Sequence, residues 1–126
     1  MPDKDDFCTA VTLSGQAGGL QSGDIVTGSG PAAHAGQKLS VQYTGWLASN
    51  GTMFDSSRSR GQAFSFTLGN HEVIQGWDDG LQGAKAGGKR RLLIPPALGY
   101  GAQGAGGAIP PNATLVFDIE VVSISG

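Results

Sequence analysis

Residues 73–81, with the sequence VIQGWDDGL, are the one stretch of this 126-residue chain in which apolar residues recur at helical spacing. Four apolar side chains would share one face of the expected helix: Val73, Ile74, Trp77 and Leu81. The stretch is too short to be stable alone in water, and Gly76 and Gly80 each weaken it by about 1 kcal/mol relative to alanine. The helix must therefore pack against a larger element, with Trp77 as its anchor.

The larger element is a β-sheet, because the rest of the chain alternates apolar and polar residues in short runs. In chain order, the expected strands are residues 24–26, 39–47, 63–68, 89–94 and 113–124. The 22 glycines and a charged fraction of only 14% favour tight turns and short strands over long helices. The fold class is therefore α+β, with an antiparallel sheet of about five strands covered on one face by one short helix.

The chain length suits one domain. Residues 1–20 are expected to form a loosely held N-terminal arm and residues 21–126 the domain. The net charge of −2 gives no electrostatic basis for binding nucleic acid or an anionic membrane. Cys8 is the single cysteine, which excludes an internal disulfide and a cysteine zinc site, and we expect no metal and no cofactor. We expect a cytoplasmic protein, but a mature exported or periplasmic domain whose signal has been removed would look the same.

Residues 99–104 match the dinucleotide-binding pattern G-x-G-x-x-G. Such a site needs a helix whose amino end holds the pyrophosphate, and the glycines and prolines of 106–111 prevent one from starting here. The chain also has no parallel βαβ unit. We reject this motif.

Other catalytic constellations are equally weak. The two histidines, His34 and His71, are too few to support a zinc site or a serine triad, and we expect His34 to be exposed. A carboxylate pair would join Asp55 to another acidic residue, but the three candidates fit solvent-facing positions: Asp78, Asp79 and Asp118. The basic run 89–91 is likewise interpreted as the solvated start of a strand.

Six aromatic residues are spread over the strands, the helix and a glycine-rich loop: Tyr43, Phe54, Phe64, Trp77, Tyr100 and Phe117. Two interpretations are open at this point. All six could form the core, which is the commoner role of large aromatic residues. Alternatively, some of them line an apolar cleft, in which the polar tips of the tyrosines and the tryptophan contact a ligand.

Five motifs, in this order and spacing, resemble those of the FKBP-type peptidyl-prolyl cis/trans isomerases: VQYTGWL, FDSSRSRGQAFSFTLG, EVIQGWDDGL, RRLLIPPALGYG and IPPNATLVFDIEV. The resemblance covers roughly residue 20 to the C-terminus and is greatest to small single-domain members. It implies a curved antiparallel sheet wrapped around one short helix, which agrees with the fold class above. It also changes the interpretation of Trp77 from a packing residue to a binding residue, and we expect one face of its indole to be open.

The resemblance implies a ligand pocket between the helix and the sheet. Trp77 would form its floor, Val73 and Ile74 an edge, and Tyr100 and Ile109 a loop that overhangs it. Four aromatic side chains would form its walls: Tyr43, Phe54, Phe64 and Phe117. Asp55 would be the polar group inside, bound to Arg60 and Tyr43. The residues implied in catalysis are Asp55, Tyr100, Phe117 and Tyr43.

The resemblance implies an enzyme that rotates X-Pro peptide bonds in proline-containing polypeptides, assists protein folding as a monomer and binds the macrolides tacrolimus and rapamycin. Ala105 and Ala108 depart from the commonest pattern of the family and bear on substrate preference and macrolide affinity. A second hypothesis is a module that grips proline segments without turnover. A chaperone role is a third, but the loop 97–112 is too short to carry the inserted flap on which such activity relies.

Overall fold

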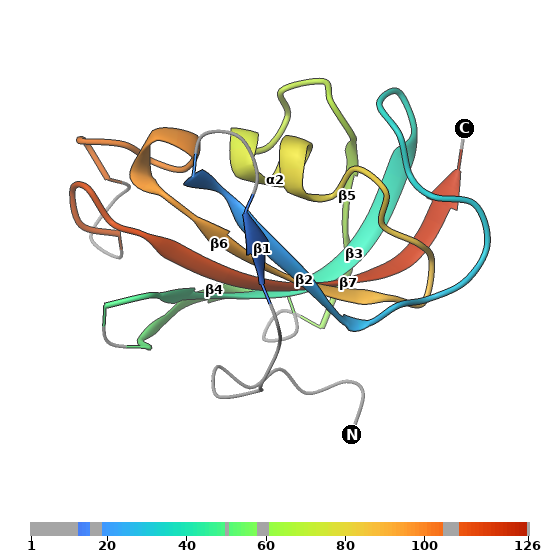
Figure 1. Ribbon diagram of the computed structural model, residues 1–126, viewed down its shortest axis with the longest axis horizontal. Helices are drawn as coiled ribbons and strands as arrows, with labels where there is room; N and C mark the ends of the chain where they lie inside the picture. Colours follow the sequence, from blue (N-terminus) through green and yellow to red (C-terminus); the bar gives the residue numbers. More distant parts are fainter. Residues whose placement is uncertain (1–12, 16–18, 50, 58–60, 105–108, 126) are drawn as a thin grey trace.

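The computed structural model describes residues 13–15, 19–49, 51–57, 61–104 and 109–125 (Figure 1). Within these residues, seven antiparallel strands form one sheet in the order β1-β2-β6-β7-β3-β4, and β5 also pairs with β3. The strands are β1 (Ser14–Gly15), β2 (Gln21–Val26), β3 (Lys38–Leu47), β4 (Met53–Ser56), β5 (Phe64–Thr67), β6 (Lys89–Ile94) and β7 (Leu115–Ser125). The expected α+β fold is confirmed, and the strand count rises from about five to seven because β1 and β4 join the sheet.

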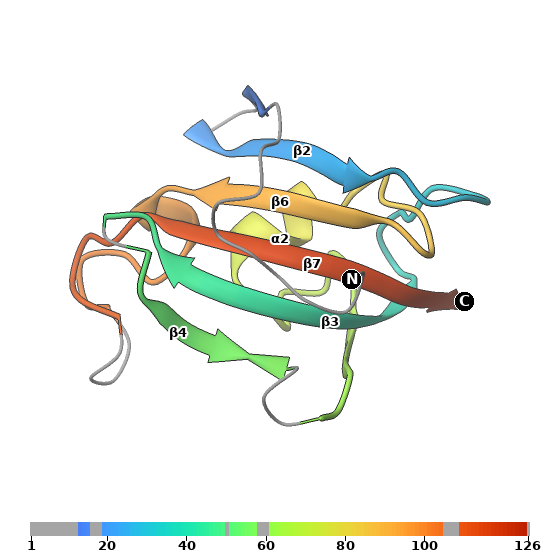
Figure 2. The same ribbon diagram turned by 90° about the horizontal axis from the view of Figure 1, so that it is seen from below.

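The sheet curves around helix α2 (Gln75–Gly80), which lies on its concave face, as Figures 1 and 2 show from two directions. A short 3₁₀ helix, η2 (Pro96–Leu98), follows β6. The helix is shorter than the expected 73–81, because Ile74 has extended backbone angles and precedes the first helical residue. Among the described residues, no helix has the length and apolar character needed to cross a membrane.

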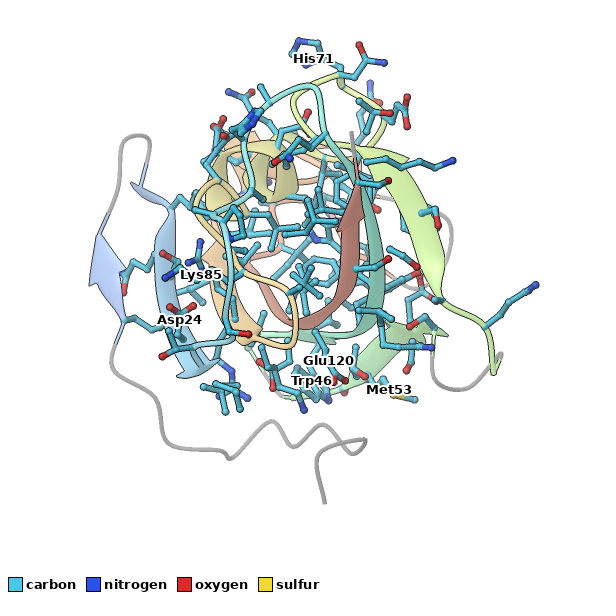
Figure 3. The ribbon with its side chains drawn as sticks, turned by 90° about the vertical axis from the view of Figure 1, so that its right-hand side faces the viewer. Asp24, Trp46, Met53, His71, Lys85 and Glu120 are labelled. Atoms are coloured by element: carbon cyan, nitrogen blue, oxygen red, sulfur yellow. The ribbon has the colours of Figure 1, made fainter. Side chains whose placement is uncertain are left out.

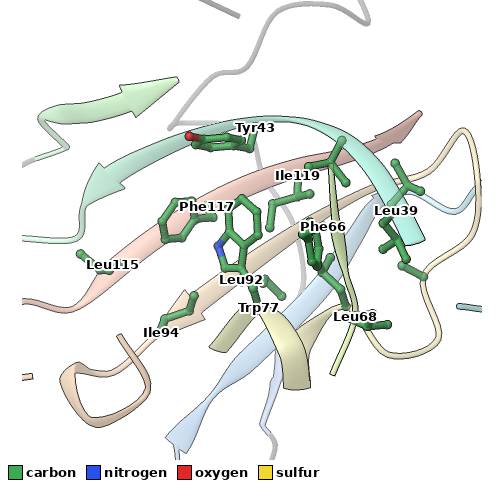
Figure 4. Packing of buried hydrophobic residues seen from close by; sticks show 14 of the residues in the cluster. Leu39, Tyr43, Phe66, Leu68, Trp77, Leu92, Ile94, Leu115, Phe117 and Ile119 are labelled. Carbon is green, nitrogen blue, oxygen red and sulfur yellow. The ribbon is translucent and has the colours of Figure 1, made fainter. Parts of the chain in front are cut away.

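The two longest strands, β3 and β7, pair along their length at the centre of the sheet, from Lys38 opposite Ser125 to Leu47 opposite Leu115. Their alternating apolar side chains face the helix and are almost fully buried: Leu39, Val41, Tyr43, Leu115, Phe117, Ile119 and Val121. Leu92 and Ile94 of β6 are also fully buried, as the alternation predicted. Figure 4 shows Tyr43, Phe117, Ile119 and Leu92 around Trp77, with Leu39 and Leu115 farther from it.

Residues 1–20 were expected to form an arm, and the structure describes only 13–15, 19 and 20 of them. Ser14 and Gly15 form a two-residue strand that pairs with Ser22 and Gln21 of β2. Leu20 is fully buried in the core. The described part of this segment therefore belongs to the folded domain.

The face of the sheet opposite the helix carries a buried charged group that the sequence analysis placed in water. Arg91 donates two hydrogen bonds to the carboxylate of Asp118, from Nε to Oδ1 at 2.6 Å and from Nη2 to Oδ2 at 2.8 Å. The guanidinium carbon of Arg91 lies 5.7 Å from the centre of the Trp46 ring. Arg91 and Lys89 are each 7% exposed and Asp118 is 1% exposed. The predictions that Asp118 faces solvent and that 89–91 is a solvated strand start were therefore wrong.

This cluster arises because β3, β7 and β6 place Thr44, Asp118 and Arg91 side by side in one row across the sheet. A carboxylate between two neighbouring strands can pair with a guanidinium on the next strand, and the planar geometry of arginine allows two parallel bonds. Figure 3 shows Trp46 and Met53 at the end of the molecule opposite to His71.

The two glycines of α2 allow the helix to lie directly on β6. A Cβ atom added to Gly80 would lie 2.7 Å from the Leu92 side chain, and one added to Gly76 would lie 2.7 Å from Ile94. These separations are below van der Waals contact. The glycines weaken the helix locally but permit the close packing that holds it in place.

Replacing Gly80 with alanine is therefore expected to destabilise the protein by about 1–3 kcal/mol, because overpacking against Leu92 exceeds the gain in helix propensity. Urea denaturation followed by circular dichroism measures the difference. Gly83→Ala is a control for substitution of a nearby glycine, because a Cβ at Gly83 would meet no atom within 4 Å, although its positive φ adds local strain. A Gly80→Ala protein more stable than the parent would contradict the packing argument.

Candidate functional site

A cavity of about 410 Å³ opens between the concave face of the sheet and the segment that leads into α2. Its volume lies within the range of about 300–1,000 Å³ typical of sites for small ligands. The residues that line it are Tyr43, Phe54, Asp55, Phe64, His71, Glu72, Val73, Ile74, Trp77, Tyr100 and Phe117. Six of these residues are Phe, Tyr or Trp, and three carry an acidic or imidazole side chain: Asp55, His71 and Glu72.

All the residues predicted for the site line this cavity, except Arg60 and Ile109. Arg60 lies outside the described residues. Ile109 is 7% exposed, belongs to the hydrophobic core and is not among the residues that line the cavity. Ala105 and Ala108 also lie outside the described residues. The structure thus brings together side chains from β3, β4, β5, β7, the turn before α2, α2 itself and the loop after η2.

Trp77 forms the floor of the cavity and is held by rings on several sides. Its ring centre lies 5.0 Å from that of Tyr43 and 5.2 Å from that of Phe117, both in edge-to-face geometry. Figure 4 shows the indole between Phe117 and Phe66, with Tyr43 beyond them. Trp77 lines the cavity although only 4% of its surface is exposed, so the expected open face is limited to a small part of the ring.

The Trp77 nitrogen has no hydrogen-bond partner among the described residues. An indole N–H is a donor, and a buried donor without an acceptor is unusual in a folded protein. Within the described part of the chain, the Trp77 N–H is thus a buried, unpaired donor among aromatic rings, which include those of Tyr43, Phe66 and Phe117.

Gly45 explains how two of the wall rings come close together. A Cβ atom at this position would lie 2.7 Å from both the Phe54 and the Phe117 rings. Those two rings meet edge to face, with their centres 5.4 Å apart and an angle of 89° between their planes. The sequence analysis missed this role, and the signal available for it was a glycine in the middle of a long apolar strand.

Asp55 is the carboxylate within the cavity, and both of its oxygens accept hydrogen bonds. The Tyr43 hydroxyl donates to Oδ2 at 2.6 Å, and the main-chain N–H of Ser56 donates to Oδ1 at 2.8 Å. The predicted contact with Tyr43 is present. These bonds fix the plane of the carboxylate and help to hold the Tyr43 ring in its edge-to-face position against Trp77.

Tyr100 brings a hydroxyl to the edge of the cavity from the loop after η2, and 39% of the residue is exposed. Burial raises the pKa of this hydroxyl, and the negative charge of Asp55 raises the pKa further. The phenol therefore stays protonated at neutral pH and throughout the mildly alkaline range. It is available as a hydrogen-bond donor at the cavity edge.

His71 and Glu72 also line the cavity, and the sequence analysis did not include them in the site. His71 has a φ of 58°, and its main-chain N–H donates to Asp78 Oδ2 at 3.0 Å, while the N–H of Gly69 donates to Asp78 Oδ1 at 2.8 Å. Asp78 is 4% exposed, so the prediction that it faces solvent was wrong. The signal that could have identified both residues is that they directly precede the predicted edge residue Val73.

Glu72 is tied into the same turn. Its carboxylate accepts hydrogen bonds from the Thr67 main-chain N–H and the Asn70 side-chain amide, both at 3.0 Å. The Thr67 bond is the main cause of a lowered pKa for Glu72, with smaller contributions from Asn70 and the charge of Lys38. The rim next to α2 thus carries a fixed negative charge beside the exposed imidazole of His71.

A family model for FKBP-type peptidyl-prolyl cis-trans isomerases matches residues 30–122. A protein of Neisseria meningitidis serogroup B named FK506-binding protein is 53% identical over 107 residues, which are 85% of this chain and 97% of that protein. FK506-binding protein 1 of Dictyostelium discoideum is 50% identical over 105 residues, covering 83% and 97%.

Among solved structures, the crystal structure of AtFKBP13 superposes with a TM-score of 0.81 at 43% identity, covering 89% of this chain and 98% of that one. The family match covers most of the described domain, and the relatives match nearly end to end. This chain therefore belongs to the FKBP-type peptidyl-prolyl cis-trans isomerase family and is an isomerase of that type.

Proposed function

We propose that the cavity above Trp77 binds the proline of an X-Pro segment and that the enzyme rotates the preceding peptide bond there. The observation that carries this proposal is the aromatic lining of a cavity of about 410 Å³, in which the Asp55 carboxylate is held by Tyr43 and Tyr100 offers a hydroxyl donor. A proline ring is compact and apolar and fits such a lining. The amide that precedes it would lie near Asp55 and Tyr100.

Rotation about an X-Pro bond is slow because it interrupts amide resonance, with a barrier of about 18–20 kcal/mol. No covalent bond is made or broken, so the reaction needs a suitable environment and no nucleophile. The planar amide is more dipolar than the twisted one. An apolar cavity therefore disfavours the planar ground state relative to the twisted transition state, which lowers the barrier.

The residues of the cavity would act in different ways. Trp77 and Phe117 hold the proline ring by shape. Tyr100 would donate a hydrogen bond to a substrate carbonyl, and its raised pKa keeps that proton in place. Asp55 and Tyr43 would act as an orienting pair, because the 2.6 Å bond between them fixes both groups at the edge of the ring stack.

We further propose that the same cavity binds the macrolides tacrolimus and rapamycin. Both curated relatives described above carry names that refer to FK506, another name for tacrolimus. An apolar floor with a few polar groups at its edge suits a large, mostly apolar ligand that presents several carbonyl oxygens.

The test is a proline-peptide isomerisation assay with and without rapamycin. The unmodified protein is expected to accelerate isomerisation well above the uncatalysed rate, which has a time constant of about 10–100 s. Rapamycin is expected to suppress this acceleration, because it would occupy the proline site. Binding of a proline peptide without acceleration would favour the alternative of a binding module. Acceleration that saturating rapamycin leaves unchanged would contradict the proposal of a shared cavity.

A further inference from the structure

The edge of β3 that faces away from β7 pairs with two different strands, β5 and β4. Val41 is its last residue opposite β5, and Thr44 is its first residue opposite β4. Gln42 and Tyr43 lie between these two ladders, at the seam between β5 and β4 along this edge of β3. A buried main-chain group that loses its hydrogen bond costs about 1–3 kcal/mol, so the bonds made at this seam help to fix the position of the strand.

Two neighbouring serine side chains supply them. The Ser57 hydroxyl accepts a hydrogen bond from the Tyr43 main-chain N–H at 2.7 Å and donates to the Gln42 side-chain oxygen at 2.6 Å. The Ser56 hydroxyl donates to the Tyr43 carbonyl at 3.2 Å and also lies 3.1 Å from the Thr44 hydroxyl. Ser57 is fully buried and Ser56 is 5% exposed. Tyr43 is thus held at the seam by side chains.

The position of Tyr43 matters because its ring and hydroxyl belong to the site. The ring centre lies 5.0 Å from that of Trp77, and the hydroxyl lies 2.6 Å from Asp55. A short hydrogen bond of this kind weakens with a displacement of a few tenths of an ångström. Whatever fixes the main chain of Tyr43 therefore also fixes the orienting pair of the cavity.

We infer that Ser57 is a positioning residue of this isomerase: its buried hydroxyl holds the Tyr43 N–H and so keeps the Tyr43 hydroxyl on Asp55. This inference rests on the proposed function of the cavity. Ser57 does not line the cavity, and it would affect the reaction only through Tyr43.

Ser56 offers a matched control, because both serines are buried, adjacent in the chain and bonded to Tyr43. Only Ser57 accepts from the Tyr43 N–H. Ser57→Ala is expected to lower kcat/KM about fivefold, since small misplacements within a site reduce rates strongly. Ser56→Ala removes only a longer 3.2 Å bond to the Tyr43 carbonyl and keeps the Ser56 N–H on Asp55, so it is expected to lower kcat/KM by a smaller factor of about two. Rates are measured well below the melting temperature of each variant, so that both are fully folded.

A double-mutant cycle with Tyr43→Phe separates positioning from a general structural role. Without the Tyr43 hydroxyl, Ser57→Ala is expected to lower kcat/KM by less than about twofold, while its effect on the melting temperature persists. An equal loss of rate in the Tyr and Phe backgrounds would overturn the inference, as would equal losses for Ser57→Ala and Ser56→Ala. If Ser57→Ala does not fold, Ser57→Cys takes its place, because a thiol fills the site and accepts only weakly.

The activity of the unmodified protein separates a failure of the positioning role from a failure of the proposed function. If it accelerates isomerisation but Ser57→Ala behaves like Ser56→Ala, the positioning role is wrong and the proposed function stands. If the unmodified protein does not accelerate isomerisation, the proposed function fails and the positioning role fails with it.

Discussion

Asp55→Ala is expected to lower kcat/KM for X-Pro isomerisation about 30-fold while leaving the protein folded. The carboxylate accepts from the Tyr43 hydroxyl and from the Ser56 N–H, and it is only partly buried. Its removal frees the Tyr43 ring and takes away the fixed charge beside Tyr100. Neither change removes much packing, so the loss should fall on catalysis.

The measurement is a peptide isomerisation assay, with circular dichroism to verify the fold. Asp79→Ala is the matched control, because Asp79 is an exposed carboxylate on α2 that does not line the cavity, and its rate should stay near that of the parent. Asp55→Asn keeps the size of the side chain and one acceptor oxygen, so it should fall between the parent and the alanine variant. Full activity of Asp55→Ala would show that the assigned orienting role is wrong.

Asp118→Ala is expected to destabilise the protein by about 3–5 kcal/mol, because it leaves Arg91 buried without its carboxylate partner. Urea denaturation measures this difference. The surface pair Arg90–Asp24 is the matched control, with Nε and Oδ1 2.8 Å apart and the Asp24 side chain 36% exposed. Asp24→Ala should cost only about 0–1 kcal/mol, since solvent screens that pair. Similar losses for both variants would contradict the argument from burial.

Replacing both Arg91 and Asp118 tests whether an unpaired buried charge causes the loss of stability. In Arg91→Met with Asp118→Leu, both charges of the pair are removed and neither is left without its partner, so most of the lost stability should return relative to Asp118→Ala. A double variant less stable than Asp118→Ala would mean that packing around Trp46, and not the unpaired charge, dominates the loss.

The sequence predicted the strands and the helix well because a period of two and a period near 3.6 are direct consequences of one-sided burial. The same pattern assigned Asp118 and Arg91 to the opposite face correctly, but it could not show that this face is buried. Whether a polar side chain on that face meets water depends on its cross-strand neighbours. Here Asp118 lies between Thr44 and Arg91, and the Trp46 ring lies against Arg91.

The sequence likewise predicted one part of the candidate site and missed another part. Family motifs brought residues from most of the chain to one cavity, including Tyr43 and Tyr100. They did not place His71 and Glu72, whose position depends on a turn with positive φ that a buried aspartate holds. They also placed Ile109 over the cavity, whereas Ile109 is not among the residues that line it. Loop side chains are hard to orient from sequence because no periodicity constrains them.

The central pairing of β3 with β7 has a consequence for the order of events during synthesis. Residues 38–47 pair with residues 115–125, so the middle of the sheet cannot close until β7 has left the ribosome. Phe117 arrives with that strand, and until then Trp77 and Tyr43 lack one of their neighbouring rings. Until β7 emerges, a nascent chain of this protein therefore exposes unpaired strand edges, which are prone to associate with other chains.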